Sequence, residues 1–168
     1  EMHLPLPEGL GASHVTIGGI MDRLDRVTHD GRRLWRIVDY KTGGDPETAD
    51  SVAQLFEVRG GKHRHYMLQT FIYAEILRRE LAPDASSIAP ALYFVHRARG
   101  KNGFSPYLKM GKGKEKSEVL DFAEQVPDFA ERLTQLVGEI LDPARSFEPL
   151  TGDEKTCKVC PFYALCYR

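Results

Sequence analysis

The chain has 168 residues, of which 42% are hydrophobic and 28% charged, a composition typical of one globular domain with a sizeable core. It contains no run of about 18 apolar residues and no signal-peptide pattern, which argues against membrane insertion and secretion. Its formal net charge of −1 excludes bulk positive charge as a means of holding nucleic acid, so any contact with a polyanion must be local.

The first predicted element is a β-hairpin. Residues 1–13 contain two prolines and two glycines and predict an irregular lead-in. Residues 14–22 and 33–40 are rich in β-branched and aromatic side chains, and the Asp30-Gly31 dipeptide between them suits a tight type I′ turn. The sequence therefore predicts two antiparallel strands joined at this turn.

This turn fixes the register of the hairpin. Asp22 is predicted to face Asp39, with the two Cβ atoms ~5 Å apart, and Lys41 shares the face of Asp39 because side chains alternate along a strand. Two carboxylates at that distance are unfavourable unless a cation lies between them. The same register places Asp25 opposite Arg36 on the other face, and this pair of opposite charges supports it.

A helix is predicted further along the chain. Residues 42–46 break the second strand, and residues 47–63 are a variable connection with a helical turn. Residues 64–81 have a helical apolar pattern without Gly or Pro. Gln69 and Tyr73 are spaced i, i+4 and lie on one face of this helix. Taken alone they are an ordinary surface pair, whereas beside a metal site they become candidate functional groups.

The second half of the chain predicts one more buried strand and one more long helix. Residues 86–97 read as a central strand with Pro90 near its start, and a short strand follows at 105–109. Residues 117–141 predict a long amphipathic helix that is kinked or interrupted at Pro127.

Short basic stretches are the candidates for a local contact with a polyanion. They occur at residues 61–65, 97–101 and 109–116. Taken singly, each is better explained as a solvated loop, and together they are candidates for the rim of one cleft.

All three cysteines lie in the last twelve residues, as Cys157, Cys160 and Cys166. CxxC followed by five residues and a third cysteine is a spacing of thiolate clusters, and zinc and iron–sulfur sites both use four ligands. The fourth ligand must then be a histidine or lie outside this chain. A disulfide is the alternative, but an odd number of cysteines cannot pair completely, and no export signal is present.

Four of these motifs, in this order, resemble the PD-(D/E)XK nucleases of the RecB/AddB type. They are GIMDR at 19–23, VDYKTG at 38–43, QTFIY at 69–73 and the CxxC-x5-C tail, and the resemblance covers the chain from about residue 14 to its end. It implies an α/β, restriction-endonuclease-like core with a central mixed β-sheet flanked by α-helices. The nuclease domain is expected to span residues 1–168, with a cysteine-bearing tail at 150–168.

The resemblance also implies roles for individual residues. Asp22 is similar to the metal-binding aspartate of the first core strand, Asp39 to the acidic residue of the (D/E)XK triplet, and Lys41 to its lysine. Gln69 and Tyr73 match the QxxxY motif of the helix beside the catalytic site.

The metal expected there is Mg²⁺ or Mn²⁺. Two opposed carboxylates and the backbone carbonyl of Tyr40 form an oxygen-rich site that suits these ions better than zinc. The ammonium of Lys41 is expected to orient the attacking water and to stabilise the transition state.

The cysteine tail is similar to the last three ligands of the [4Fe–4S] cluster of AddB-type nucleases, whose first cysteine lies far upstream. These proteins also carry an upstream Glu or His that completes the metal site, and residues 1–13 do not clearly supply it. Both features lead us to expect the C-terminal fragment of a larger protein.

The leading hypothesis is a metal-dependent DNA nuclease domain of a helicase-linked double-strand-break repair protein. It would hydrolyse phosphodiester bonds at single-stranded DNA ends in an exonuclease-like manner. The expected partners are DNA and a helicase domain or subunit, in the cytoplasm at the nucleoid and without a membrane. The alternative is a nuclease-fold module that binds DNA or a partner without cutting. A third hypothesis keeps only a zinc-type knuckle at the C-terminus and treats the acidic hairpin as structural.

Overall fold

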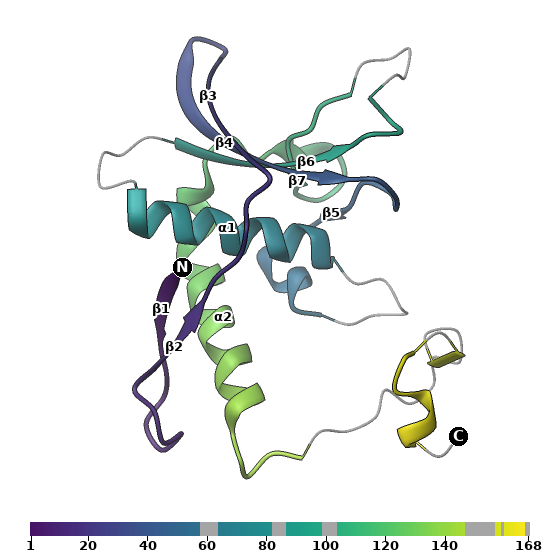
Figure 1. The fold of residues 1–168 in the computed structure, drawn as a ribbon. Helices are drawn as coiled ribbons and strands as arrows, with labels where there is room; N and C mark the ends of the chain where they lie inside the picture. The colour runs from purple at the N-terminus through teal and green to yellow at the C-terminus, as the bar shows by residue number, and fades with distance from the viewer. Residues whose placement is uncertain (58–63, 82–86, 99–103, 147–156, 159, 167–168) are drawn as a thin grey trace.

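The computed structural model describes residues 1–57, 64–81, 87–98, 104–146, 157–158 and 160–166, in which three small sheets surround two long helices (Figure 1). The strands are β1 (Met2–Pro5), β2 (His14–Ile17), β3 (Arg23–His29), β4 (Arg32–Lys41), β5 (Thr48–Ala49), β6 (Ser87–Phe94), β7 (Lys109–Met110) and β8 (Ser117–Glu118). The α-helices are α1 (His65–Leu81) and α2 (Val126–Leu141), and short 3₁₀ turns occur at Val52–Leu55, Gly113–Glu115, Phe122–Gln125 and Tyr163–Cys166. No helix in these ranges is long and apolar enough to cross a membrane.

The central sheet is mixed, as expected from the sequence. Its strand order is β3-β4-β6, with β3 antiparallel and β6 parallel to β4. A parallel neighbour requires a crossover connection, and the chain between β4 and β6 includes α1, which lies across one face of the sheet (Figure 1). α2 packs beneath α1, so the expected sheet flanked by helices is confirmed.

The hairpin of β3 and β4 has the predicted turn and register. Asp30 and Gly31 have φ values of 47° and 76°, the left-handed conformation that a type I′ turn requires at both central positions. Asp25 is the cross-strand partner of Arg36, as predicted.

The prediction of one strand over residues 14–22 is wrong. β2 ends at Ile17 and pairs with β1 in a separate two-stranded sheet, and the chain enters the central sheet only at Arg23. Gly18 and Gly19 lie at the break, where two residues of low β propensity release the chain from the first ladder. The lead-in is likewise not irregular throughout, because β1 lies within it.

The predicted helix of residues 64–81 is confirmed by α1. The predicted strand of residues 86–97 is confirmed only in part by β6, which ends at Phe94 and lies at the end of the strand order, not at its centre. The predicted helix of residues 117–141 begins later, at Val126, after β8 and a 3₁₀ turn. Pro127 lies in the first turn of α2, where its missing N–H is not needed, so proline starts this helix and does not kink it.

The remaining differences concern the region around β6. Pro90 lies within β6, not near its start, and the strand expected at 105–109 is reduced to an isolated bridge at Tyr107 followed by β7.

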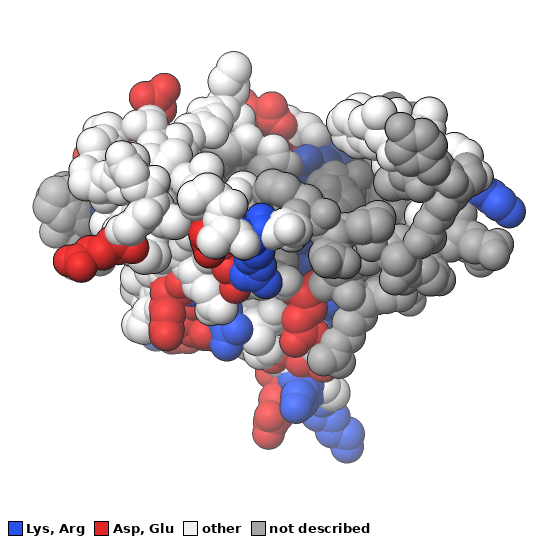
Figure 2. All heavy atoms as spheres, turned by 90° about the horizontal axis from the view of Figure 1, so that it is seen from below, with Lys and Arg blue, Asp and Glu red and all other residues white. Residues whose placement is uncertain are grey.

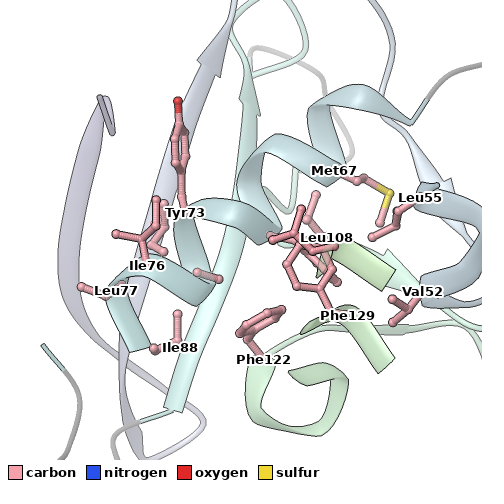
Figure 3. Packing of buried hydrophobic residues seen from close by; sticks show 14 of the residues in the cluster. Val52, Leu55, Met67, Tyr73, Ile76, Leu77, Ile88, Leu108, Phe122 and Phe129 are labelled. Atoms are coloured by element: carbon pink, nitrogen blue, oxygen red, sulfur yellow. The ribbon is translucent and has the colours of Figure 1, made fainter. Parts of the chain in front are cut away.

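Aromatic side chains form the centre of the main core between the two helices (Figure 3). Phe71 of α1, Phe122 of the 3₁₀ turn before α2 and Phe129 of α2 are fully buried, and their rings make edge contacts with centroid separations of 5.2–5.6 Å. This packing holds α1 against α2 and so determines the direction in which the helix face with Gln69 and Tyr73 points.

A buried carboxylate ties α1 to the N-terminal strand. Glu75 has no exposed surface and accepts hydrogen bonds from Arg78 and Arg79, and Arg79 also donates to the carbonyl of His3 in β1. Burial alone would raise the pKa of Glu75, but the hydrogen bonds and charges of the two arginines outweigh it, so this pKa is lowered.

We expect this network to make stability depend on acid pH. A carboxylate with a lowered folded-state pKa stabilises the protein above its unfolded pKa, and this contribution is lost as the pH falls through the folded pKa, below the usual value of 4.5. In urea titrations, Glu75→Gln should reduce the free energy of unfolding by about 3 kcal/mol at pH 7. The difference from the original protein should shrink below pH 4.5, and a pH-independent difference would contradict the assignment.

Candidate active site

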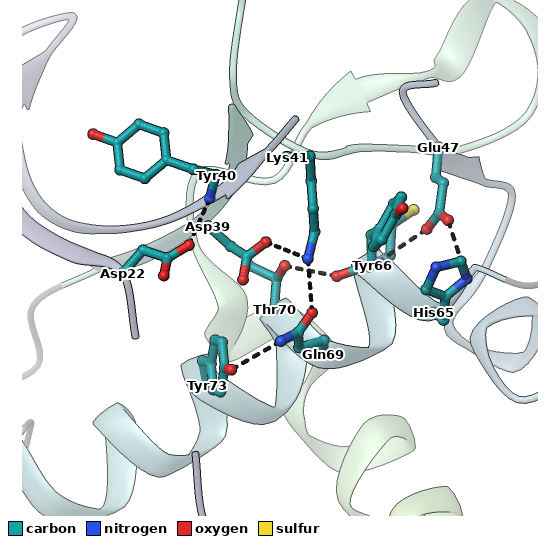
Figure 4. Close-up of polar contacts among 11 residues, drawn as sticks. Asp22, Asp39, Tyr40, Lys41, Glu47, His65, Tyr66, Gln69, Thr70 and Tyr73 are labelled. Atoms are coloured by element: carbon teal, nitrogen blue, oxygen red, sulfur yellow. Dashed lines mark hydrogen bonds and ion pairs between the residues drawn. The ribbon is translucent and has the colours of Figure 1, made fainter. Parts of the chain in front are cut away.

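The ammonium of Lys41, at the end of β4, is held by three groups (Figure 4). Its Nζ lies 2.6 Å from Oδ2 of Asp39, donates a 3.0 Å hydrogen bond to Oε1 of Gln69, and lies 4.4 Å from the ring centroid of Tyr66. The ammonium is thus held by one hydrogen bond, one ion pair and one aromatic ring. The side chain is only 15% exposed, and its position is therefore well defined.

Asp39 is buried, and one of its oxygens lacks an aligned donor. The side chain is 5% exposed, and its Oδ2 makes the close ion pair with Lys41. That contact does not have the alignment of a hydrogen bond, so Oδ2 receives none from the residues that the structure describes. A buried carboxylate oxygen in this state is costly unless a second cation approaches it.

Asp22 lies beside Asp39 but not as a regular cross-strand partner. The β3–β4 ladder ends at the pair of Arg23 and Val38, one residue before Asp22. The Asp22 carboxylate instead accepts a 2.8 Å hydrogen bond from the backbone N–H of Tyr40, and in Figure 4 it points toward Asp39. The backbone of β4 thus orients an exposed carboxylate next to a buried one.

The expected helix pair also lies at this site. Nε2 of Gln69 donates a 2.9 Å hydrogen bond to Oη of Tyr73, which leaves its carbonyl oxygen for Lys41. The sequence-predicted residues Asp39, Lys41, Gln69 and Tyr73 thus form one continuous chain of contacts, with Asp22 at its edge.

Gly19 is close to this chain of contacts. A Cβ atom at Gly19 would lie 2.7 Å from Cε1 of Tyr73, whose ring is buried and cannot easily move. Glycine is therefore required where the segment that leads to Asp22 crosses α1.

We expect Gly19→Ala to destabilise the protein by about 1–3 kcal/mol through this overpacking. Gly43→Ala is the matched control, because no atom lies within 4 Å of its added Cβ. Thermal unfolding of both variants measures the difference. Equal melting temperatures would show that the contact with Tyr73 is not rigid.

Tyr66 is a member of the site that sequence reasoning missed. Its ring covers the ammonium of Lys41 and lies against Gly44, where an added Cβ would be 3.1 Å from the ring. The signal was present in the sequence, because Tyr66, Gln69 and Tyr73 share one helix face at i, i+3 and i+7.

The contact of Glu47 with the start of α1 was also not predicted from the sequence. Its Oε2 accepts a 3.0 Å hydrogen bond from the backbone N–H of Met67 in the first turn of α1, and its Oε1 lies 3.8 Å from Nδ1 of His65. Burial raises the pKa of Glu47, despite the opposing hydrogen bond from Met67. Glu47 caps the N-terminus of α1, and no local pattern predicts this because the loop after β4 must first fold back.

The chemistry of the site fits a divalent cation of the Mg²⁺ type. Such ions bind through one or two carboxylates and keep several waters or substrate oxygens. Asp22 and Asp39 provide two carboxylates. The buried Oδ2 of Asp39 accepts no aligned hydrogen bond from the described residues and is therefore able to bind a cation. No cluster of three or more His, Cys, Asp or Glu side chains suited to a metal ion occurs in the described ranges.

The cysteine tail is described only in part. Cys157 and Cys160 are half-buried, and the backbone N–H of Cys160 donates to the carbonyl of Cys157 at 3.1 Å, which forms a turn. Cys166 is the last residue of the 3₁₀ turn Tyr163–Cys166. The side chain of Cys166 lies outside the described part of the chain, so a cluster of the three thiols stays a prediction.

Comparison with known proteins agrees with the fold. No curated protein and no solved structure matched the chain significantly. The family model of the PD-(D/E)XK nuclease superfamily matches residues 2–167, which is nearly the whole chain. A match of this extent, with a mixed sheet and a flanking helix that bring Asp39, Lys41 and Gln69 together, shows that the chain belongs to the PD-(D/E)XK nuclease superfamily.

Proposed function

We propose that this chain is a Mg²⁺- or Mn²⁺-dependent deoxyribonuclease domain that acts on single-stranded DNA ends. The observation that carries the proposal is the buried Asp39 oxygen, which has an ammonium on one side and no aligned donor among the described residues. Asp22 is held next to it by the backbone of β4. An acidic pair with a fixed lysine suits metal-assisted hydrolysis of a phosphodiester, which needs a bound cation and a positive charge near the phosphate.

Asp22, Asp39 and the carbonyl of Tyr40 would hold the cation. In an antiparallel pair, the N–H and C=O of one residue point toward the same neighbour. The Tyr40 N–H points to Asp22, which supports a carbonyl directed to the same side. A cation bound there would neutralise charge on the phosphate and lower the pKa of an attacking water.

Lys41 would act on the water and on the phosphate. Its ammonium is positioned to donate to the attacking oxygen and to stabilise the charge that develops on the phosphoryl oxygens. Gln69 accepts from Lys41 and donates to Tyr73, so both hold the lysine in one orientation without contacting the reacting atoms. Fixing a long, flexible side chain in advance reduces the entropy lost in the transition state.

The wider proposal is a RecB/AddB-type nuclease domain over residues 1–168, linked to a helicase domain or subunit in double-strand-break repair in the cytoplasm. Cys157, Cys160 and Cys166 of the 150–168 tail would supply three thiolates of a [4Fe–4S] cluster. The motif order and the cysteine spacing support this. A brown protein after anaerobic purification of the full-length form is the expected result, and a colourless zinc protein would contradict it.

Cleavage and metal binding test the central proposal. A single-stranded oligonucleotide should be degraded in Mn²⁺ and remain intact in EDTA. Asp39→Asn should abolish degradation and weaken Mn²⁺ binding in calorimetry, whereas Asp45→Asn, an exposed control on the following loop, should change neither. Mn²⁺ and DNA binding without any cleavage by the original protein would favour the alternative, a binding module of nuclease fold.

A further inference from the structure

A second cationic feature lies on the β3–β4 hairpin, away from the Lys41 site. A pocket of about 310 Å³ is lined by residues of the two strands, namely Arg26, Val27, Thr28, Arg33, Leu34 and Trp35. None of these residues is acidic, although the whole chain has a net charge of −1. The pocket is therefore locally positive, although the chain as a whole is slightly negative.

The pocket is built on two adjacent cross-strand pairs. Arg26 pairs with Trp35, and Thr28 pairs with Arg33, so the four side chains share one face of the hairpin. The guanidinium of Arg26 lies over the indole of Trp35, with Cζ 4.4 Å from the ring centroid. Trp35 also packs against the main core, so the arginine is held flat on a fixed ring.

The two arginines of the pocket differ from Arg23 and Arg36 on the opposite face. Arg23 and Arg36 are neutralised by Asp25, whose two oxygens lie 2.7 and 2.8 Å from their nitrogens. Arg26 and Arg33 are exposed and form no ion pair with a carboxylate within the described part of the chain. On the pocket face of the hairpin, both arginines thus keep their charge uncompensated, whereas on the opposite face Asp25 neutralises Arg23 and Arg36 but not Arg32 at the turn.

The pocket and the proposed active site lie on the same face of β4. Because side chains alternate, Arg33, Trp35, Ile37 and Asp39 lie on the same face of β4. Trp35 and Asp39 are four residues apart, which corresponds to about 13 Å along the strand at a rise of ~3.3 Å per residue. Ile37 between them is fully buried in the main core together with residues of α1, so a bound chain would pass beside the helix.

We propose that this pocket binds single-stranded DNA next to the active site. An arginine held flat on an aromatic ring presents its outer face to a base and its N–H edge to a phosphate. Arg33 supplies a second phosphate contact across the pocket. On the face seen from below, acidic and basic side chains are interspersed (Figure 2), whereas the residues that line the pocket include two arginines and no carboxylate. This inference rests on the proposed nuclease function for the role of the strand, but not for its binding.

A matched pair of double variants tests the proposal. Labelled oligothymidylate is titrated with the full chain in EDTA, and fluorescence anisotropy reports the affinity at several salt concentrations. Arg26→Gln with Arg33→Gln should weaken binding about ten-fold and reduce the slope of log K against log salt by about 1.4, or 0.7 for each phosphate contact. The control is Arg132→Gln with Arg145→Gln, which removes the same amount of positive charge from two arginines that are paired with Asp128 and Glu139. This control should change neither the affinity nor the salt slope.

Trp35 gives an independent readout, because it is the only tryptophan in the chain. Its emission should change when oligothymidylate binds, and this change should be lost in the Arg26 and Arg33 double variant, whose urea midpoint should be unaltered. Unchanged emission on binding, or equal losses of affinity in the two double variants, would overturn the proposal. Tighter binding of oligouridylate than of oligothymidylate would overturn the assignment to DNA.

Failure of this inference and failure of the proposed function give different results. If the pocket variants lose binding in EDTA but the original protein cuts no DNA in Mn²⁺, the pocket stands and the nuclease proposal fails. If the original protein cuts DNA and the pocket variants bind and cut equally well, the nuclease proposal stands and the pocket fails.

Discussion

Lys41→Met should lower cleavage by about 10²–10³-fold without weakening Mn²⁺ binding. Loss of a preorganised charge that stabilises the transition state has an effect of this size. The lysine is not a ligand of the cation, and its ammonium competes for Oδ2 of Asp39, 2.6 Å away. Removing it therefore leaves that oxygen available to the metal.

The same substitution should also change stability in a metal-dependent way. In EDTA, the Lys41→Met variant leaves the buried Asp39 carboxylate without the ammonium of Lys41 and without a metal ion. Its free energy of unfolding should therefore fall by about 3 kcal/mol. Mn²⁺ should restore part of this loss, because it binds the folded state only. Urea titrations with and without Mn²⁺ measure both values.

A suitable control removes a lysine that is not buried. Lys109 is 47% exposed and lies 4.0 Å from Glu118, so Lys109→Met should leave cleavage and stability nearly unchanged. Full cleavage by Lys41→Met would contradict the role proposed for Lys41.

The second large effect is expected in the core. Phe71→Ala removes a fully buried ring that contacts both Phe122 and Phe129, and the free energy of unfolding should fall by about 3–5 kcal/mol. This is a large part of the 5–15 kcal/mol typical of a domain. Phe71 is two residues from Gln69 on α1, so a cavity here should also loosen the support of Lys41 and lower cleavage at temperatures where the variant is still folded.

Urea denaturation followed by circular dichroism checks this prediction. Phe162→Ala is the control, because Phe162 is 64% exposed in the C-terminal segment and its truncation should cost less than about 0.5 kcal/mol. Similar losses in both variants would show that the core is not organised around the three phenylalanine rings.

The sequence by itself determined the features that depend on local chemistry. The Asp30-Gly31 turn set the hairpin register, because only residues that tolerate positive φ suit a type I′ turn. The uninterrupted apolar pattern of residues 64–81 was sufficient to predict α1. The motif order indicated the superfamily before any contact was known, and the family match confirms it.

Other features were decided only by the tertiary structure. The pattern of residues 14–22 is compatible with either sheet, and the choice depended on β1, whose buried Met2 is far from the hairpin in sequence. Glu47 and Tyr66 reach their places because the loop after β4 folds back onto α1. The cationic pocket of the hairpin depends on which arginines Asp25 neutralises. The physical reason is the same in each case, since contacts between distant segments depend on packing and leave no periodic signal in the chain.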